Sequence, residues 1–247
     1  MFLAKATNLI VDGLMALVYP QACAICQGCV SKRQLGIACA DCWEATHIFS
    51  DADTICWKCG APSLGTIDPE KRTSVRCRRC DDDAYTVARA CGEYKGALQA
   101  VVLALKREPN VSQQLLNLLA EVQQIPPLDQ STVVIPVPLH REREKDRGFN
   151  QAATIGSQLA RKLKLPFVDN TLVRTSHSEK HRAGMDASAR RDSVAKAFAV
   201  SYPRLVEGEK ILLVDDVFTT GATVSACAEA LLAADAAAVF VLTIARA

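Results

Sequence analysis

The sequence predicts an α/β fold, in which a mostly parallel sheet with flanking helices follows a small cysteine-rich segment. From Tyr85 onward, apolar strand-length runs alternate with helical segments, a pattern typical of a parallel sheet covered on both faces. Ahead of Tyr85, cysteines recur in C-x-x-C pairs, the spacing of zinc knuckles. The chain has 247 residues, of which 49% are hydrophobic. That is enough for a real core, in one large domain or in a medium domain joined to a smaller one.

The first segment, residues 1–22, is predicted to be an amphipathic helix. Apolar residues recur at helical spacing from Phe2 to Val18, and polar residues such as Lys5 and Asp12 interrupt them. The stretch is too short and too polar to cross a bilayer, and it lacks the apolar core of a signal peptide. We therefore expect no transmembrane segment here, and we expect this helix to pack on the protein's own body, with contact to a membrane surface as the alternative. We expect a cytoplasmic location, which keeps the thiols reduced.

Residues 23–84 are predicted to form a double zinc ribbon. Four C-x-x-C pairs follow one another, namely Cys23/Cys26, Cys39/Cys42, Cys56/Cys59 and Cys77/Cys80. The short gap within a pair puts both sulfurs on one side of a turn, so two pairs supply the four thiolates of a closed, structural Zn²⁺ site. The spacing leaves two alternatives open: the first and third pairs could share a metal, and Cys29 could replace Cys23 in its pair.

The remaining cysteines, the tryptophans and the charges of this region carry weaker signals. Cys91 and Cys227 lie in apolar or helical surroundings and are expected to be buried. Trp43 and Trp57 each follow a zinc ligand and are expected to form the small cores of the knuckles. The basic run at 71–79 is either a solvated face or a nucleic-acid contact. The acidic run that follows it favours the first, and a net charge of +2 does not by itself argue for nucleic acid.

The body of the chain, residues 85–247, is predicted element by element. Helices are expected at 96–106, 111–124, 149–165 and 222–234, and strands at 132–135, 211–214 and 238–245. Ile125-Pro-Pro127 ends the second helix, because proline cannot continue it. In parallel sheets, ligands bind at the carboxyl ends of strands. We therefore expect the loops that follow the strands at 132–135 and 211–214 to face one site.

The segment 211–223 carries the most chemistry. A buried strand ends in Asp215 and Asp216, and a short turn then opens a helix; this turn consists of Thr219, Thr220, Gly221, Ala222 and Thr223. Free amides at a helix start bind anions, glycine allows close backbone approach, and threonines add hydroxyl donors. Ionised carboxylates accept hydrogen bonds from vicinal hydroxyls. The segment thus predicts a ribose 5-phosphate site. A receiver domain also carries an acid pair after a strand, but near its start rather than near the C-terminus.

The segment between Pro136 and Asn150 is predicted to be a loop that contacts pyrophosphate. Arg143 and Arg147 supply forked donors for phosphate oxygens, and prolines stiffen the base of the loop. The alternative is an exposed charged loop, in which acidic residues balance the arginines.

Several motifs occur here in the order found in the ComF family. They are the cysteine pairs, Leu105-Lys106, Ile135-Pro-Val-Pro-Leu-His140, Arg147-Gly-Phe-Asn-Gln151 and Leu213-Val-Asp-Asp-Val-Phe-Thr-Thr-Gly-Ala-Thr223. From about Cys23 to its end the chain resembles this family, and the last motif resembles the phosphoribosyl pyrophosphate (PRPP) motif of type I phosphoribosyltransferases. The resemblance implies a type I phosphoribosyltransferase-like domain behind the zinc ribbon.

The same resemblance implies roles for individual residues. Asp215 and Asp216 would hold the ribose hydroxyls as the catalytic acid pair, the turn at 219–223 would hold the 5-phosphate, and Lys106 would belong to the ligand site. Mg²⁺ would bridge ribose and pyrophosphate. Family members are associated with natural transformation, so the implied partners are PRPP, single-stranded DNA and a helicase-like competence protein at the inner face of the membrane. The alternative function is an active phosphoribosyltransferase on an unidentified acceptor.

The segment 173–198 departs from the family pattern. It contains no glutamine, and Ser193 and Lys196 stand where the family has asparagine and glycine. Its basic residues suffice for a cationic lid over pyrophosphate; they are Arg174, His177, Lys180, His181, Arg182 and Arg190.

Overall fold

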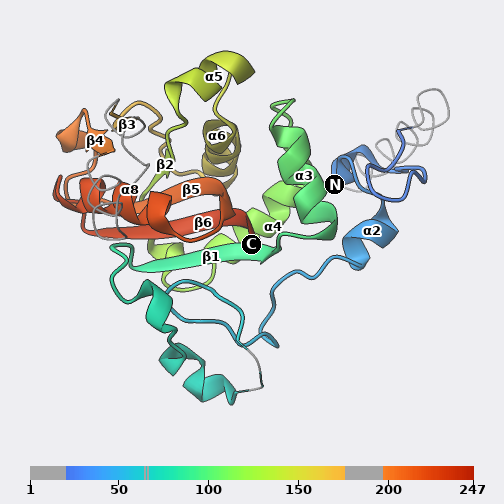
Figure 1. The fold of residues 1–247 in the computed structure, drawn as a ribbon, viewed down its shortest axis with the longest axis horizontal. Coiled ribbons are helices and arrows are strands. Elements are labelled where there is room, and N and C mark those ends of the chain that lie inside the picture. The colour runs from blue at the N-terminus through green and yellow to red at the C-terminus, as the bar shows by residue number, and fades with distance from the viewer. Residues whose placement is uncertain (1–20, 64, 66, 176–196) are drawn as a thin grey trace, which may run out of the picture.

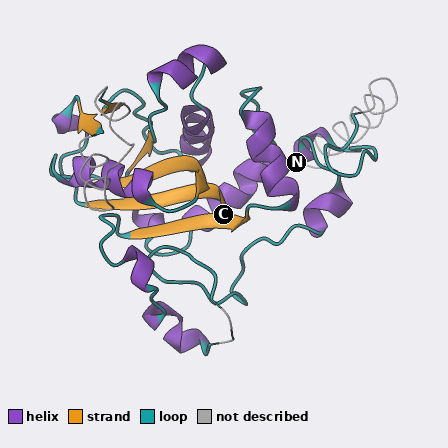
Figure 2. Ribbon diagram, in the orientation of Figure 1, coloured by secondary structure: helices purple, strands orange, loops and turns teal. Residues whose placement is uncertain are grey.

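The computed structural model describes residues 21–63, 65, 67–175 and 197–247 (Figure 1). A four-stranded parallel sheet with the order β1-β6-β5-β2 lies at its centre. The strands are β1 (Val87–Glu93), β2 (Val133–Pro136), β5 (Lys210–Phe218) and β6 (Ala238–Arg246). Figure 2 shows this sheet with helices above and below it. The predicted α/β fold with a parallel sheet is confirmed.

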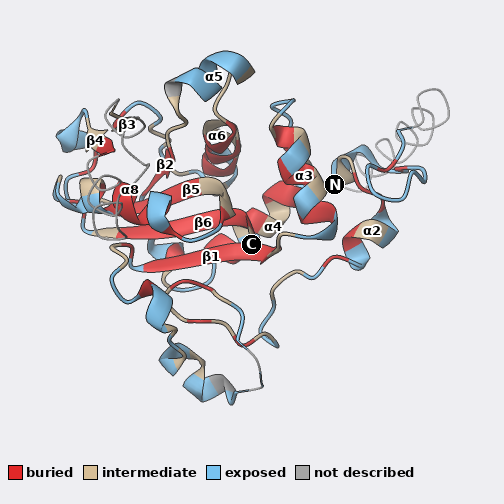
Figure 3. Ribbon diagram, viewed as in Figure 1, coloured by how far each residue is buried: buried red, intermediate tan, exposed pale blue. Residues whose placement is uncertain are grey.

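Strand side chains alternate between two apolar cores, one on each face of the sheet. On one face, Leu212 and Leu242 pack with three helices, α3 (Gly96–Leu105), α4 (Gln113–Gln123) and α6 (Gln151–Leu163). On the other face, Leu213 and Val241 pack with α8 (Ala222–Leu232). A small antiparallel hairpin of β3 (Leu172–Arg174) and β4 (Phe198–Val200) also belongs to this second core. Both strands that carry these residues are buried on both faces, as their continuous apolar runs predict (Figure 3).

The predicted helices and strands are present, with ends that shift by a few residues, and the strand predicted at 211–214 is longer than expected. β5 runs on to Phe218 because β6 supplies backbone partners as far as the pair Phe218 and Arg246. The prediction that the strand ends at the acid pair is therefore wrong, since Asp215 and Asp216 lie inside it. β1 was not predicted, because Arg89 and Gly92 break its apolar run.

The two cysteine knuckles pack on opposite faces of the sheet. The first knuckle, with α2 (Ala40–Glu44), shares the core of α3 and α4 through Cys23 and Trp43. The second shares the core of α8 through Cys56 and Cys59. Between them the chain follows the edge of β1, where the Phe49 amide donates to the Cys91 carbonyl at 2.8 Å. Figure 1 accordingly shows α2 beside α3 and the second knuckle below β1.

The burial of two cysteines and two tryptophans can be compared with the predictions from the sequence. Cys91 and Cys227 are both fully buried, as predicted. Trp43 is also buried and donates its indole N–H to the Leu35 carbonyl at 3.0 Å. Trp57 is only half-buried and lies under the Arg89 guanidinium, 5.0 Å from the ring centroid. Trp57 is thus covered by a cation, and it also packs against the core that contains Cys23 and Trp43.

Within the described part of the chain, no helix is long and apolar enough to span a membrane. The amphipathic helix predicted at 1–22 lies almost wholly outside the described residues, so the structure does not test it.

Candidate functional site

The site lies at the carboxyl edge of the sheet, where β5 outruns β2. Pairing between these strands ends at Pro136 and Val214, whereas β5 continues beside β6 to Phe218. Beyond Val214, the β2 side of β5 is therefore free of a strand partner. The residues that this offset leaves without a β2 neighbour include the half-buried Asp215 and Asp216, and the turn that opens α8 follows them directly. This is the edge at which parallel sheets bind ligands.

The two carboxylates leave the strand in opposite directions, because side chains alternate along it. Asp216 points toward α6, where its Oδ2 accepts a hydrogen bond from Gln151 Nε2 at 2.7 Å and its Oδ1 accepts one from the Val217 amide at 2.7 Å. Asp215 points toward α8, and among the described residues its Oδ1 accepts a hydrogen bond from the Asp216 amide alone, at 2.9 Å. The acid pair is therefore asymmetric: Asp216 is held by two donors and Asp215 by one.

The surroundings of Asp215 set the charge of the pair. Burial first, and then the neighbouring Asp216 charge, together raise the pKa of Asp215 to about 8. Near neutral pH, Asp215 thus holds its proton beside a hydrogen-bonded Asp216. A group that titrates close to the working pH is suited to transfer a proton or to exchange it for a cation.

Gln151 connects the acid pair to the arginine segment, and the sequence analysis did not assign it a role. It is the first residue of α6 and is 6% exposed. Its Oε1 accepts a hydrogen bond from Arg147, while its Nε2 donates to Asp216. A buried amide with both ends satisfied has one orientation. The chain Arg147, Gln151, Asp216 thus brings together the two loops that were expected to face one site. The only sequence signal for Gln151 was its place at a helix start in a shared motif.

The segment predicted to be a pyrophosphate loop contains a helix, so that prediction needs correction. α5 (Arg141–Arg147) begins after His140 and ends at Gly148, whose φ of 77° is left-handed. Acidic residues in its first turn and basic residues in its last turn both favour this short helix. Arg143 and Arg147 lie one turn apart on α5 and therefore on the same side of it. Arg147 belongs to the hydrogen-bonded chain described above, and Arg143 is exposed.

The turn at 219–223 has the geometry of an anion site. Gly221 is the N-cap of α8 and has a φ of +84°. A Cβ at this position would lie 2.7 Å from Phe218 Cζ, so only glycine fits. Thr219, Thr220, Ala222 and Thr223 are all exposed around it. The first-turn amides of an 11-residue helix, which have no acceptor within the helix, open onto these hydroxyls.

Other predicted site residues lie apart from this group. Lys106 is the half-buried C-cap of α3, and it is not part of the hydrogen-bonded chain that joins the two loops. Arg174 ends β3, with its guanidinium 5.5 Å from the centre of the Phe198 ring. The other basic residues of the proposed lid, from His177 to Arg190, lie outside the described residues.

The cysteines form two separate four-sulfur groups with the pairing that their sequence order predicts. One group is Cys23, Cys26, Cys39 and Cys42, and the other is Cys56, Cys59, Cys77 and Cys80. Neighbouring sulfurs are 3.5–3.7 Å apart, close to the edge of about 3.8 Å of a tetrahedron with Zn–S bonds of 2.3 Å. In each group a backbone amide donates to the first sulfur at 3.3 Å. Both groups could hold zinc.

The two alternatives for the zinc ligands do not hold. The first and third C-x-x-C pairs lie in different sulfur groups, so the interleaved arrangement is excluded. Cys29 is exposed and belongs to neither group.

Comparison with known proteins gives one domain match and several relatives. The family described as phosphoribosyl transferase domain matches residues 150–247. Competence protein F of Haemophilus influenzae is 38% identical over 93 residues, which are 37% of this chain and 40% of that protein. Competence protein ComFC of Bacillus subtilis is 32% identical over 104 residues, 42% of this chain and 40% of that protein. The chain thus matches less than half the length of these two relatives.

A longer match is found with DNA utilization protein YhgH of Escherichia coli. It is 29% identical over 238 residues, which cover 93% of this chain and 99% of that protein. Among solved structures, a glutamine PRPP amidotransferase from B. subtilis has a TM-score of 0.39 and 17% identity, over 57% of this chain and 30% of that one.

Proposed function

We propose that this chain, which is similar to competence protein F, ComFC and YhgH and matches the phosphoribosyl transferase domain over residues 150–247, is a ComF-family protein that binds PRPP with Mg²⁺ and acts in DNA uptake. The proposal rests above all on the hydrogen bonds that link the side chains of Arg147, Gln151 and Asp216. These hydrogen bonds join an arginine at the end of α5 to a carboxylate at the edge of the sheet. A ligand with a phosphate, a diol and a pyrophosphate needs an anion-binding turn, a carboxylate and a cation at one edge of the sheet. The exposed turn at 219–223 supplies the anion-binding part.

Each part of the ligand has a matching group. The 5-phosphate would meet the amides and threonine hydroxyls at the start of α8, and the ribose hydroxyls would meet the acid pair. Arg147, held by Gln151, would face the pyrophosphate. Mg²⁺ prefers oxygen ligands and keeps several waters, so it would sit between ligand phosphates and the carboxylates rather than in a protein cage. Bound there, it would neutralise the pyrophosphate charge.

Titration of the zinc-loaded protein with PRPP and Mg²⁺ by calorimetry tests this proposal. We expect binding by the parent and at least a tenfold weaker affinity for Asp216→Asn, because the ligand loses a charged acceptor. Gln151→Leu should weaken binding by a similar factor without touching the ligand, since it frees both Arg147 and Asp216. Arg161→Met, on the exposed side of α6, is the control and should bind like the parent. A parent protein that does not bind PRPP would refute the proposal.

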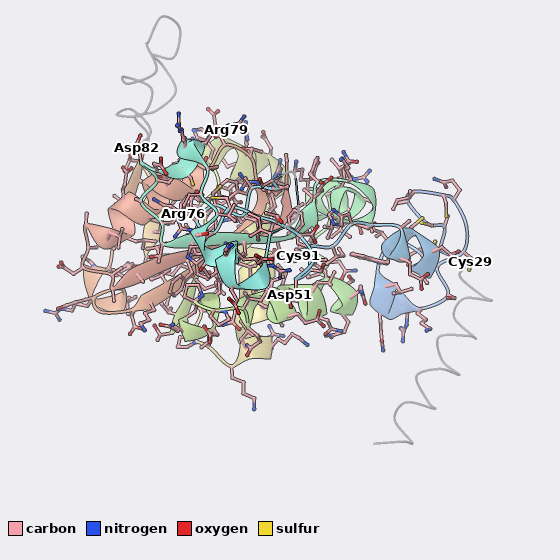
Figure 4. All side chains as sticks on the ribbon, turned by 90° about the horizontal axis from the view of Figure 1, so that it is seen from below. Cys29, Asp51, Arg76, Arg79, Asp82 and Cys91 are labelled. Atoms are coloured by element: carbon pink, nitrogen blue, oxygen red, sulfur yellow. The ribbon has the colours of Figure 1, made fainter. Side chains whose placement is uncertain are left out.

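The surface around the second knuckle is the best candidate for single-stranded DNA. Arg76, Arg78 and Arg79 are exposed there. Figure 4 shows Arg76 and Arg79 on the segment that encloses the second sulfur group. Trp57 lies nearby but is stacked under Arg89, so electrostatic contact with the DNA backbone is favoured over base stacking.

Binding of a fluorescent oligothymidine at several salt concentrations tests this surface. We expect Arg76→Glu/Arg79→Glu to weaken binding about tenfold or more in low salt and to reduce the salt dependence, because fewer counterions are released. Lys162→Glu/Lys164→Glu, a change of equal charge at the C-terminal end of α6, is the control. Equal effects of the two double variants would indicate unspecific attraction and refute this assignment.

An active phosphoribosyltransferase is the second candidate function. The observation in its favour is the position of Asp215, whose pKa of about 8 suits a general acid or base near neutral pH. One proton has to be transferred when pyrophosphate is displaced from the anomeric carbon. Either Asp215 or the acceptor itself would take part in that transfer. Release of pyrophosphate from PRPP in the presence of candidate nucleobases distinguishes turnover from binding alone.

A further inference from the structure

The second sulfur group lies directly behind the turn at 219–223, although the two are far apart in the sequence. Arg246, near the end of β6, makes the first connection. Its Nη1 donates to the Cys59 carbonyl at 2.5 Å and its Nη2 to Cys59 Sγ at 3.7 Å. The same guanidinium lies 4.3 Å from the centre of the Phe218 ring. Phe218 in turn is the side chain that a Cβ on Gly221 would strike.

A second connection starts from the other half of the same knuckle. The Asp83 amide donates to the carbonyl of Cys80, a ligand of the second group, at 3.2 Å. The Asp83 Oδ2 accepts a hydrogen bond from the Tyr85 hydroxyl at 2.6 Å and lies 3.4 Å from where a Cβ on Gly221 would be. The ring of Tyr85 packs edge-on against Phe218, with centroids 5.9 Å apart.

A third connection reaches the helix that the turn opens. The Ala84 amide donates to Ser225 Oγ at 3.0 Å, in the first turn of α8. Arg246, Phe218 and the Asp83 to Tyr85 segment therefore form one packed layer between the second sulfur group and the anion-binding turn. The first sulfur group packs into the core on the opposite face of the sheet.

We propose that Arg246 is a positioning residue through which the metal of the second sulfur group holds the turn at 219–223 in its binding shape. The proposal deepens the proposed function, since the ligand held is the phosphate of PRPP. A four-thiolate Zn²⁺ site carries a net charge of −2, and a guanidinium that donates to a ligand sulfur offsets part of it. Because Arg246 also covers Phe218, a shift of Cys59 would change the position of the Phe218 ring beneath Gly221.

Two measurements on full-length, zinc-loaded proteins test this coupling. The first is hydrogen exchange of the segment 218–225 without any ligand, and the second is calorimetric titration with PRPP and Mg²⁺. The variants are Arg246→Met, which keeps the side-chain length without donors or charge, and Cys59→Ser, which removes a ligand of the second group. Arg161→Met is the matched control for the first. Cys26→Ser, at the same place in the first group, is compared with Cys59→Ser. Zinc content is measured for each protein.

We expect Arg246→Met to keep two zinc ions and yet to exchange amides of 218–225 at least fivefold faster and to bind PRPP at least tenfold more weakly. Cys59→Ser should show the same exchange with one zinc ion, and its effect on the segment should be at least fivefold larger than that of Cys26→Ser. Unchanged exchange in Arg246→Met would overturn the proposal, as would equal effects of the two cysteine variants. If the parent does not bind PRPP, the proposed function fails, and the exchange measurement still decides the coupling.

Discussion

Gly221→Ala is expected to destabilise the protein by about 2–4 kcal/mol and to abolish binding at the turn. Two costs add up at this position. A left-handed φ of +84° is unfavourable for alanine, and the new Cβ would lie 2.7 Å from Phe218 Cζ. Relief of that overlap requires the ring to leave its place under Arg246, 4.3 Å away. Urea unfolding of the zinc-loaded protein measures the change in the free energy of unfolding.

Gly208→Ala is the matched control for this substitution. Gly208 has a similar φ of +73°, but nothing lies within 4 Å of the position that its Cβ would take. Only the backbone term remains there, so we expect a loss of about 1 kcal/mol and unchanged ligand binding. Equal losses for the two variants would show that the contact with Phe218 does not constrain the turn.

Asp215→Asn is expected to make the ligand-free protein more stable at pH 8 by about 2–3 kcal/mol. The pKa of Asp215 is raised from its ordinary 3.8 to about 8, first by burial and then by Asp216. As pH rises from 4 to 8, the unfolded chain releases this proton while the folded chain keeps it, so the parent loses stability across that window. Asparagine resembles the protonated acid and carries no such loss. The expected gain is smaller than the full shift allows, because water reaches a half-buried carboxylate.

Thermal or urea unfolding of both proteins at intervals from pH 4 to pH 9 tests this prediction. The difference between variant and parent should be near zero at pH 4, grow to pH 8 and remain constant above it. Titration of the zinc ligands affects both proteins alike and cancels in the difference. A difference that does not vary with pH would contradict the assignment of a proton to Asp215. In the presence of Mg²⁺ and PRPP the sign should reverse, because the ionised form then gains partners.

Most of the fold could be predicted from local patterns in the sequence. Both faces of β5 and β6 are buried, so these strands appear as continuous apolar runs that need no tertiary information to be recognised. The C-x-x-C spacing likewise defines each half of a metal site by local geometry alone. β1 and α5 were not predicted, because their local patterns are not typical of the elements that they form. Arg89 interrupts the apolar run of β1 and is tolerated because it stacks on Trp57, and α5 has no apolar face at all.

The sequence by itself determined the order of the elements, the composition of the two sulfur groups up to their pairing, and the turn at 219–223, because each depends on neighbours along the chain. Only the tertiary structure decided how these parts meet. It extends β5 beyond β2, turns Asp215 and Asp216 to opposite faces and places Gln151 between Arg147 and Asp216. It also puts Arg246 between Cys59 and Phe218, which lie 159 residues apart. Contacts of that kind depend on strand order and register, which apolar periodicity does not encode.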